Sequence, residues 1–233
     1  MAVELTAVHI PTPQRKPAKK ARSKAGWLLL IALYSYLLWL MLEITLQYIP
    51  IDSGAAFLAI KQDYVGMLHY RIAFFVHVFS SIFVLAAGYT QFSKRILARH
   101  RQLHRKLGWF YVLVTVCLAG PSGFVIGLYA NGGLSSRIAF CTLAVLWVLF
   151  TILATVSAIR RQIQAHRRWM LRSFALALSA LTLRAWKYVL VLALHPKPMD
   201  VYRVVAWLGW VANLLAVEVY IYYKFREVKE VKK

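Results

Sequence analysis

Six long apolar runs, separated by short polar segments, dominate the pattern of this chain. Each run holds about 20 or more mostly apolar residues, the length that an α-helix needs to cross a hydrocarbon core about 30 Å thick. Backbone groups inside a bilayer must be satisfied within the protein, so such runs form helices. We therefore predict an all-α integral membrane bundle with six transmembrane helices, at residues 27–49, 68–92, 108–130, 138–159, 173–194 and 201–223.

The composition agrees with a membrane protein. Of the 233 residues, 61% are hydrophobic, whereas a soluble domain is typically about 45–50% apolar. The mean hydropathy is +0.58. We expect three parts: a disordered, basic cytoplasmic arm at residues 1–26, the transmembrane domain at residues 27–223, and a charged cytoplasmic tail at residues 224–233.

The distribution of charge predicts the orientation. A net charge of +21 would suggest nucleic acid as a partner in a soluble protein. Here the connections on one side of the apolar runs carry 22 of the 29 Lys and Arg residues, and those on the other side carry five. Because cytoplasmic loops are enriched in Lys and Arg, both termini are predicted to be cytoplasmic. The partner expected at this face is a bilayer with anionic headgroups, not nucleic acid.

Several polar side chains fall inside the predicted spans, at similar depths below the outer boundary. A charge at the bilayer centre costs roughly 2.5–3.5 kcal/mol on insertion scales, so these side chains are expected to face one another within the bundle. Two interpretations stay open: a functional polar pocket in which Glu43 pairs with Arg184 or Lys187, or a purely structural ion pair that fixes the packing, with Lys187 extending outward. The expected cluster consists of Glu43, His77, Arg184, Lys187 and Asn213.

Histidines on different helices suggest a cofactor. His104 and His166 lie at similar depth near the cytoplasmic ends of two spans, and a bis-His b-type heme needs two such ligands. His77 is the candidate ligand for an outer heme or a quinone. The alternative is that His104 and His166 bind lipid headgroups, and no metal site is expected. Further polar residues at the cytoplasmic face are Gln91, Arg105, Arg168, Arg172 and Glu218.

Two segments carry a resemblance to a known family. They are His104-Arg105-Lys-Leu-Gly108-Trp-Phe-Tyr111 and Ala165-His166-Arg167-Arg168-Trp169-Met170-Leu-Arg172-Ser173. The chain, over roughly residues 68–223, resembles a bacterial family of predicted multi-pass membrane proteins of unknown function. The resemblance implies the fold and the bacterial inner membrane, and no activity. The histidine layout is more loosely similar to helical diheme cytochromes of the b561 and ferric-reductase type, which place their paired histidines deeper within the helices.

Three functions fit these observations. The first is a b-type heme or quinone-linked electron-transfer component. The second is a non-catalytic accessory or assembly subunit that docks to other membrane subunits. The third is a small proton-coupled transporter. No phosphate-binding glycine-rich loop, zinc-protease motif or nucleophile elbow is present in the sequence, so soluble enzyme classes are disfavoured.

A reporter fused at Asn131 checks the orientation. This residue lies between the third and fourth predicted spans, on the side that is poor in Lys and Arg. We expect alkaline phosphatase to be active and green fluorescent protein to be dark at this position, and the reverse for fusions after Lys233. A fluorescent fusion at Asn131 would contradict the predicted orientation.

Overall fold

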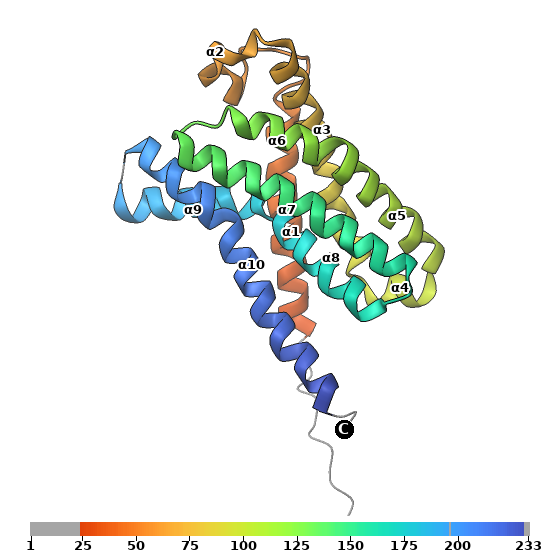
Figure 1. The fold of residues 1–233 in the computed structure, drawn as a ribbon. Coiled ribbons are helices and arrows are strands. Elements are labelled where there is room, and N and C mark those ends of the chain that lie inside the picture. The colour runs from red at the N-terminus through yellow and green to blue at the C-terminus, as the bar shows by residue number, and fades with distance from the viewer. Residues whose placement is uncertain (1–23, 196, 231–233) are drawn as a thin grey trace, which may run out of the picture. The chain divides into compact units, whose positions relative to one another are not determined.

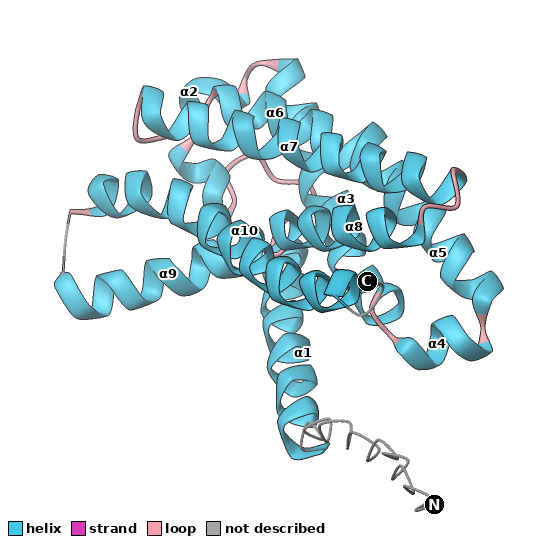
Figure 2. Ribbon diagram, turned by 60° about the horizontal axis from the view of Figure 1, so that its bottom comes forward, coloured by secondary structure: helices cyan, strands magenta, loops and turns pink. Residues whose placement is uncertain are grey.

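Helices form the whole of the regular structure. The computed structural model describes residues 24–195 and 197–230. Within these residues no strand is present (Figure 2), so the all-α prediction is confirmed. Most of the expected N-terminal arm, residues 1–23, and the last three residues of the expected tail lie outside the described residues. Residues 224–230 continue the last helix.

The six predicted spans correspond to five continuous membrane-length elements and one broken pair (Figure 1). The broken pair takes the place of the fifth span, and its two helices are bent by 45° relative to each other. The elements are α1 (Lys24–Leu46), α3 (Leu68–Gln91), α5 (Arg101–Leu113) continued by η2 (Val114–Ala119) and α6 (Gly120–Leu128), α7 (Leu134–Ile159), the pair α8 (Ile163–Ala177) and α9 (Ser179–Leu194), and α10 (Pro198–Glu230). Shorter helices occupy the connections: η1 (Ala56–Ile60), α2 (Gln62–Val65) and α4 (Lys94–Arg99).

The chain divides inside α1 into two compact units, residues 1–35 and 36–233. The first unit contains the start of α1, where the Ser35 hydroxyl donates a hydrogen bond to the Ile31 carbonyl at 2.8 Å. The second unit contains all the other helices. Within it α7 packs against both α6 and α8, and α9 packs against α10.

A buried hydrogen-bond network joins α5, α7 and α8. The Tyr111 hydroxyl lies 2.8 Å from the Ser173 hydroxyl, which lies 2.7 Å from the Thr151 hydroxyl. All three residues are buried. Hydroxyl pairs between helices are favoured inside a membrane, where an unpaired polar group is costly. This network fixes α8 against α5 and α7 just before the interruption between α8 and α9.

Asn213 of α10 stabilises the break between α8 and α9. Its Nδ2 donates to the Ala175 carbonyl at 3.0 Å and to the Thr182 hydroxyl at 2.9 Å. The Thr182 hydroxyl in turn donates to the Gly209 carbonyl at 2.5 Å. One side chain on α10 therefore holds groups on both sides of the bend, where regular helical bonding is interrupted.

Replacing Asn213 with leucine tests this role. The leucine has a similar size but no donor, so it leaves the Ala175 carbonyl and the Thr182 hydroxyl short of a partner. A buried unsatisfied group costs about 1–3 kcal/mol, and we expect Asn213→Leu to lower the melting temperature in detergent clearly. The exposed Leu215, two residues further along α10, supplies the control, since Leu215→Ala is expected to have little effect. Equal melting temperatures for the two variants would contradict the role of Asn213.

Candidate functional site

A cavity of about 220 Å³ lies among the helices of the second unit. Its wall is mostly apolar and comes from η1, α3, η2, α6, α7, α8, α9 and α10. Aromatic and aliphatic side chains line most of it, including Phe74, Phe140, Leu143 and Trp147. Apolar pockets with a few convergent polar groups are the usual form of small-molecule sites.

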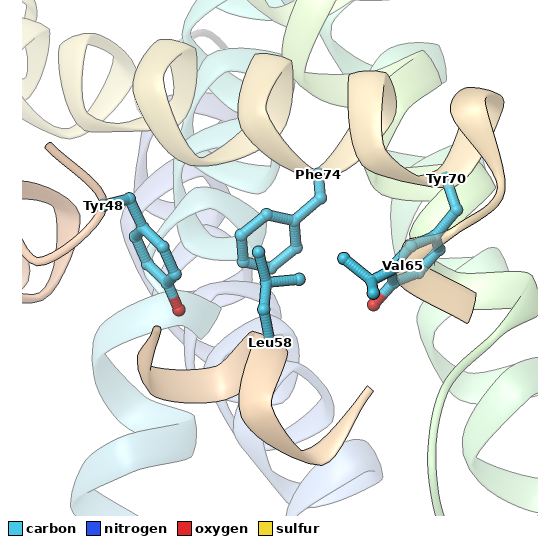
Figure 3. Close-up of a cluster of buried hydrophobic side chains, with 5 residues drawn as sticks. All are labelled: Tyr48, Leu58, Val65, Tyr70 and Phe74. Carbon is cyan, nitrogen blue, oxygen red and sulfur yellow. The ribbon is translucent and has the colours of Figure 1, made fainter. Parts of the chain in front are cut away.

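The short helices after α1 pack onto the cavity wall. Leu58 of η1 and Val65 of α2 are buried against Phe74 and Tyr70 of α3, with Tyr48 beside them (Figure 3). The Tyr48 ring meets the Phe74 ring edge-on, with centroids 5.1 Å apart. This aromatic cluster anchors the connection of residues 47–67 and brings Phe57 and Lys61 into the lining of the cavity.

Lys61 is buried, with a relative exposure of only 2%. Its ammonium donates to the Tyr129 carbonyl and, at 2.5 Å, to Asn131 Oδ1, both in the turn between α6 and α7. The rings of Phe57 and Tyr64 lie 5.7 and 5.3 Å from it. Burial lowers the pKa of Lys61 to about 8, nearby Arg137 also lowers it, and Asp63 raises it in part.

His77 faces the interrupted part of the third span. Its Nδ1 lies 2.9 Å from the Ala119 carbonyl, and because a carbonyl can only accept, Nδ1 carries the hydrogen. Nε2 of a neutral His77 is therefore an acceptor, able to take a proton or a ligand's hydrogen bond. The ring packs so closely on Gly123 that a Cβ there would lie 3.0 Å from Cε1.

The Ala119 carbonyl belongs to a widened turn. Residues Val114–Ala119 form a π-helical turn, and Pro121 lies two residues after its end. Proline lacks the N–H that a regular helix needs, and such π turns occur often at functional sites. The Ala119 carbonyl, which also accepts from the Ser122 hydroxyl at 3.3 Å, holds the imidazole of His77 beside this irregularity.

Arg184 lies on α9, in the second turn after the break, and also lines the cavity. Its Nη1 donates to the Ala180 carbonyl of the same helix at 2.7 Å. Among the described lining residues there is no Asp or Glu. Lys61 and Arg184 thus contribute two cationic groups to a mostly apolar space without a carboxylate beside them.

The predicted polar cluster forms only in part. His77 and Arg184 share the cavity as expected. The predicted ion pair of Glu43 with Arg184 or Lys187 is wrong for the described residues: Glu43 is exposed and accepts from Trp39 Nε1 at 2.9 Å, one turn away on α1. Lys187 is exposed as well. Asn213 bonds to the α8–α9 break instead of lining the cavity.

An ion pair joins α8 and α10 at the predicted cytoplasmic side. Arg172 donates to both oxygens of Glu218, at 2.5 and 2.7 Å, and its guanidinium lies 4.6 Å from the centre of the Trp169 ring. Arg172 and Glu218 were both expected at this face, although not as partners of each other. Such bidentate pairs are strong and directional, which indicates a structural role for the two residues.

The histidines at that side lie outside the cavity lining. His166 donates from Nδ1 to the Ala154 carbonyl at 2.9 Å, and its Nε2 is thereby oriented for another interaction. The Nδ1 atom of His104 is buried without a hydrogen-bond partner. The His104 carbonyl accepts from Gln91 Nε2 at 3.3 Å. Arg105 is exposed, and Arg168 lies 5.9 Å from the Phe225 ring.

Lys61 is the site residue that sequence analysis missed. Counting basic residues for orientation treats every lysine in a connection as solvated. A signal was available: Lys61 lies between Phe57 and Tyr64, in the longest outer connection. Aromatic neighbours at such spacing can enclose an ammonium group.

The comparisons with known proteins give a family and nothing closer. Residues 74–221 match the sequence profile of a family described as predicted membrane protein (DUF2306). The matched segment contains His77 and Arg184 and begins after Lys61. No curated protein and no solved structure matches the chain.

The buried Lys61 predicts that stability rises with pH. Its pKa is about 8 in the folded protein and has its ordinary value of 10.5 in the unfolded chain. Between these values the unfolded chain binds more protons, so the free energy of unfolding increases with pH. From pH 7 to pH 9 this gain is about 1 kcal/mol. It is measured as a rise in the melting temperature, with intrinsic fluorescence as the signal for unfolding. Lys61→Met lacks the titrating group and should show a smaller rise; an identical rise would contradict the burial of a charged Lys61.

Proposed function

The chain belongs to the DUF2306 family of predicted membrane proteins, and we propose that this member is a small-molecule transporter of the bacterial inner membrane. One observation carries the proposal: the cavity lies where two membrane-spanning segments are interrupted. Ala177 and Ser179, on either side of the α8–α9 break, line it together with Ala119 of the π turn. The proposal includes both termini in the cytoplasm, which the distribution of Lys and Arg supports.

Interrupted helices at a shared cavity suit a transporter. Irregular backbone at membrane depth is tolerated where it is buried in protein or lines a cavity. Transporters build substrate sites from such discontinuous helices, whose two halves can tilt independently. The 45° bend between α8 and α9 supplies a hinge next to Arg184, and the π turn supplies a second irregularity opposite His77.

His77 is the group proposed to couple substrate binding to a proton. Its Nδ1 is held by the Ala119 carbonyl, so a proton is gained and lost at Nε2. Glu43, which the sequence suggested as part of a relay, is exposed and bonded to Trp39. The proposed coupling therefore needs no carboxylate.

Thiol labelling from the two sides of the membrane tests the proposal. Ser81→Cys places a thiol in the cavity, in a background carrying Cys117→Ala and Cys141→Ala. Right-side-out and inverted vesicles are treated with membrane-impermeant methanethiosulfonate reagents, one anionic and one cationic. A transporter exposes its site alternately, so we expect at least one reagent to label Ser81→Cys in both kinds of vesicle. Leu215→Cys, an exposed apolar position well inside the last predicted span, is the control and should stay unlabelled in both.

Labelling of Ser81→Cys from one side only would overturn the transporter proposal. Labelling of Leu215→Cys would show that the reagents enter the bilayer, and vesicles that pass this control are used for the comparison. Because the readout is access to the cavity, the test requires no knowledge of the substrate.

A redox role is the second candidate, favoured by the orientation of two histidines. His77 and His166 each donate from Nδ1 to a backbone carbonyl, the arrangement that often orients Nε2 of a ligating histidine. His166 with His104 would hold a b-type heme, and His77 would contact a quinone carbonyl. An absorbance spectrum of the purified protein tests the heme, and solvent extraction followed by chromatography tests the quinone; a Soret band or a stoichiometric quinone would favour this candidate over transport.

A further inference from the structure

Two cationic side chains in the cavity lack a counter-ion. In the part of the chain that the structure describes, the salt bridges are Arg172–Glu218 and Arg203–Asp200, and neither involves Lys61 or Arg184. A buried charge without an opposite charge is costly. Hydrogen bonds to neutral acceptors reduce this cost for Lys61 and Arg184, and the charge of nearby Asp63 offsets that of Lys61 only in part.

Both side chains keep donors for a further ligand. An ammonium has three N–H donors, and Lys61 uses two of them, on Tyr129 and Asn131. A guanidinium has five, and Arg184 uses one of them on the Ala180 carbonyl. Since both residues line the same cavity, a ligand there meets unused N–H donors on positively charged groups.

The rest of the wall selects against highly charged ligands. Apolar side chains such as Val84, Leu85 and Ile126 make up most of it. Moving a doubly charged phosphate into such surroundings costs far more than moving a single carboxylate. The planar guanidinium also matches a carboxylate, whose two oxygens can accept in parallel. The cavity therefore fits one small anionic head joined to an apolar body.

The volume limits the size of that body. At about 220 Å³ the cavity lies below the roughly 300–1,000 Å³ typical of sites for drug-sized ligands. A ring or a short alkyl chain fits, and a full phospholipid does not. The aromatic side chains Phe74, Phe140 and Trp147 offer faces and edges on which a flat ring packs well.

We propose that the cavity binds a small organic carboxylate with an apolar body, held by Lys61 and Arg184; as a statement about the substrate, this rests on the transporter function proposed above. Arg184, whose planar guanidinium keeps four unused donors, binds the carboxylate directly, and Lys61 adds positive charge to the same cavity. The charge of the carboxylate supplies the counter-ion that the described lining residues do not.

Benzoate and benzamide form the matched probe pair. They have nearly the same shape, but only benzoate carries a charge at neutral pH. Binding to the purified full-length protein in detergent is followed by isothermal titration calorimetry. We expect benzoate to bind about tenfold or more tightly than benzamide, the difference expected for charge-assisted hydrogen bonds.

Substitutions then assign the preference to residues. Lys61→Met and Arg184→Met should each abolish most of the preference for benzoate, and Arg184→Lys should restore part of it. Lys187→Met is the control, because Lys187 lies one turn beyond Arg184 on α9 but outside the cavity lining. It should keep the full preference. The melting temperature of each variant establishes that it is folded before its binding is compared.

The two proposals fail in different ways. Equal binding of benzoate and benzamide by the wild-type protein, or no binding of either, would overturn the carboxylate site, and this comparison needs no variant. It would leave two-sided labelling of Ser81→Cys unaffected. A preference for benzoate that persists in both Lys61→Met and Arg184→Met would also overturn it. A preference that depends on these residues, without two-sided labelling, would support the carboxylate site and contradict transport.

Discussion

A polar group at membrane depth has to find its partner within the protein, and the structure of residues 36–195 and 197–230 follows from this constraint. Because lipid offers no hydrogen bonds, long apolar segments become helices. Where a helix is interrupted, a side chain from another helix completes the bonding. Asn213 does so at the α8–α9 break, and His77 hydrogen-bonds to the last carbonyl of the π turn. The same requirement brings Arg172 and Glu218 together at the opposite side of the bundle.

The cavity is a consequence of these interruptions. A continuous fifth span would carry α9 straight on from α8 instead of turning it by 45°, and the wall formed by Ala180 and Arg184 would be displaced. The π turn shifts the face that α6 presents, so that glycines rather than larger side chains meet α3 and α7. The cavity and its polar groups thus occur together. The irregular backbone leaves space between the helices, and its carbonyl groups also accept hydrogen bonds from polar side chains.

Sequence patterns predict the helices well and the site only in part. Hydrophobic length locates all six segments, since insertion into lipid depends on length and apolarity. The break at Leu178 escapes this reasoning, because the run Ala175 to Leu181 has no proline or glycine and its bend depends on Asn213, more than thirty residues later. His77 and Arg184 were identified by their depth. Glu43 was assigned wrongly because depth does not say which way a helix face points, and Lys61 was missed because a connection outside the spans can still be buried.

Gly123 bears on how this protein can vary. Since a Cβ at this position would lie 3.0 Å from Cε1 of the His77 ring, even alanine requires the imidazole to yield by a few tenths of an ångström. The apolar side chains elsewhere on the wall tolerate exchange for others of similar volume. Exchanges of similar volume at the apolar wall can therefore change what the cavity accommodates, whereas any larger side chain at Gly123 disturbs the histidine itself.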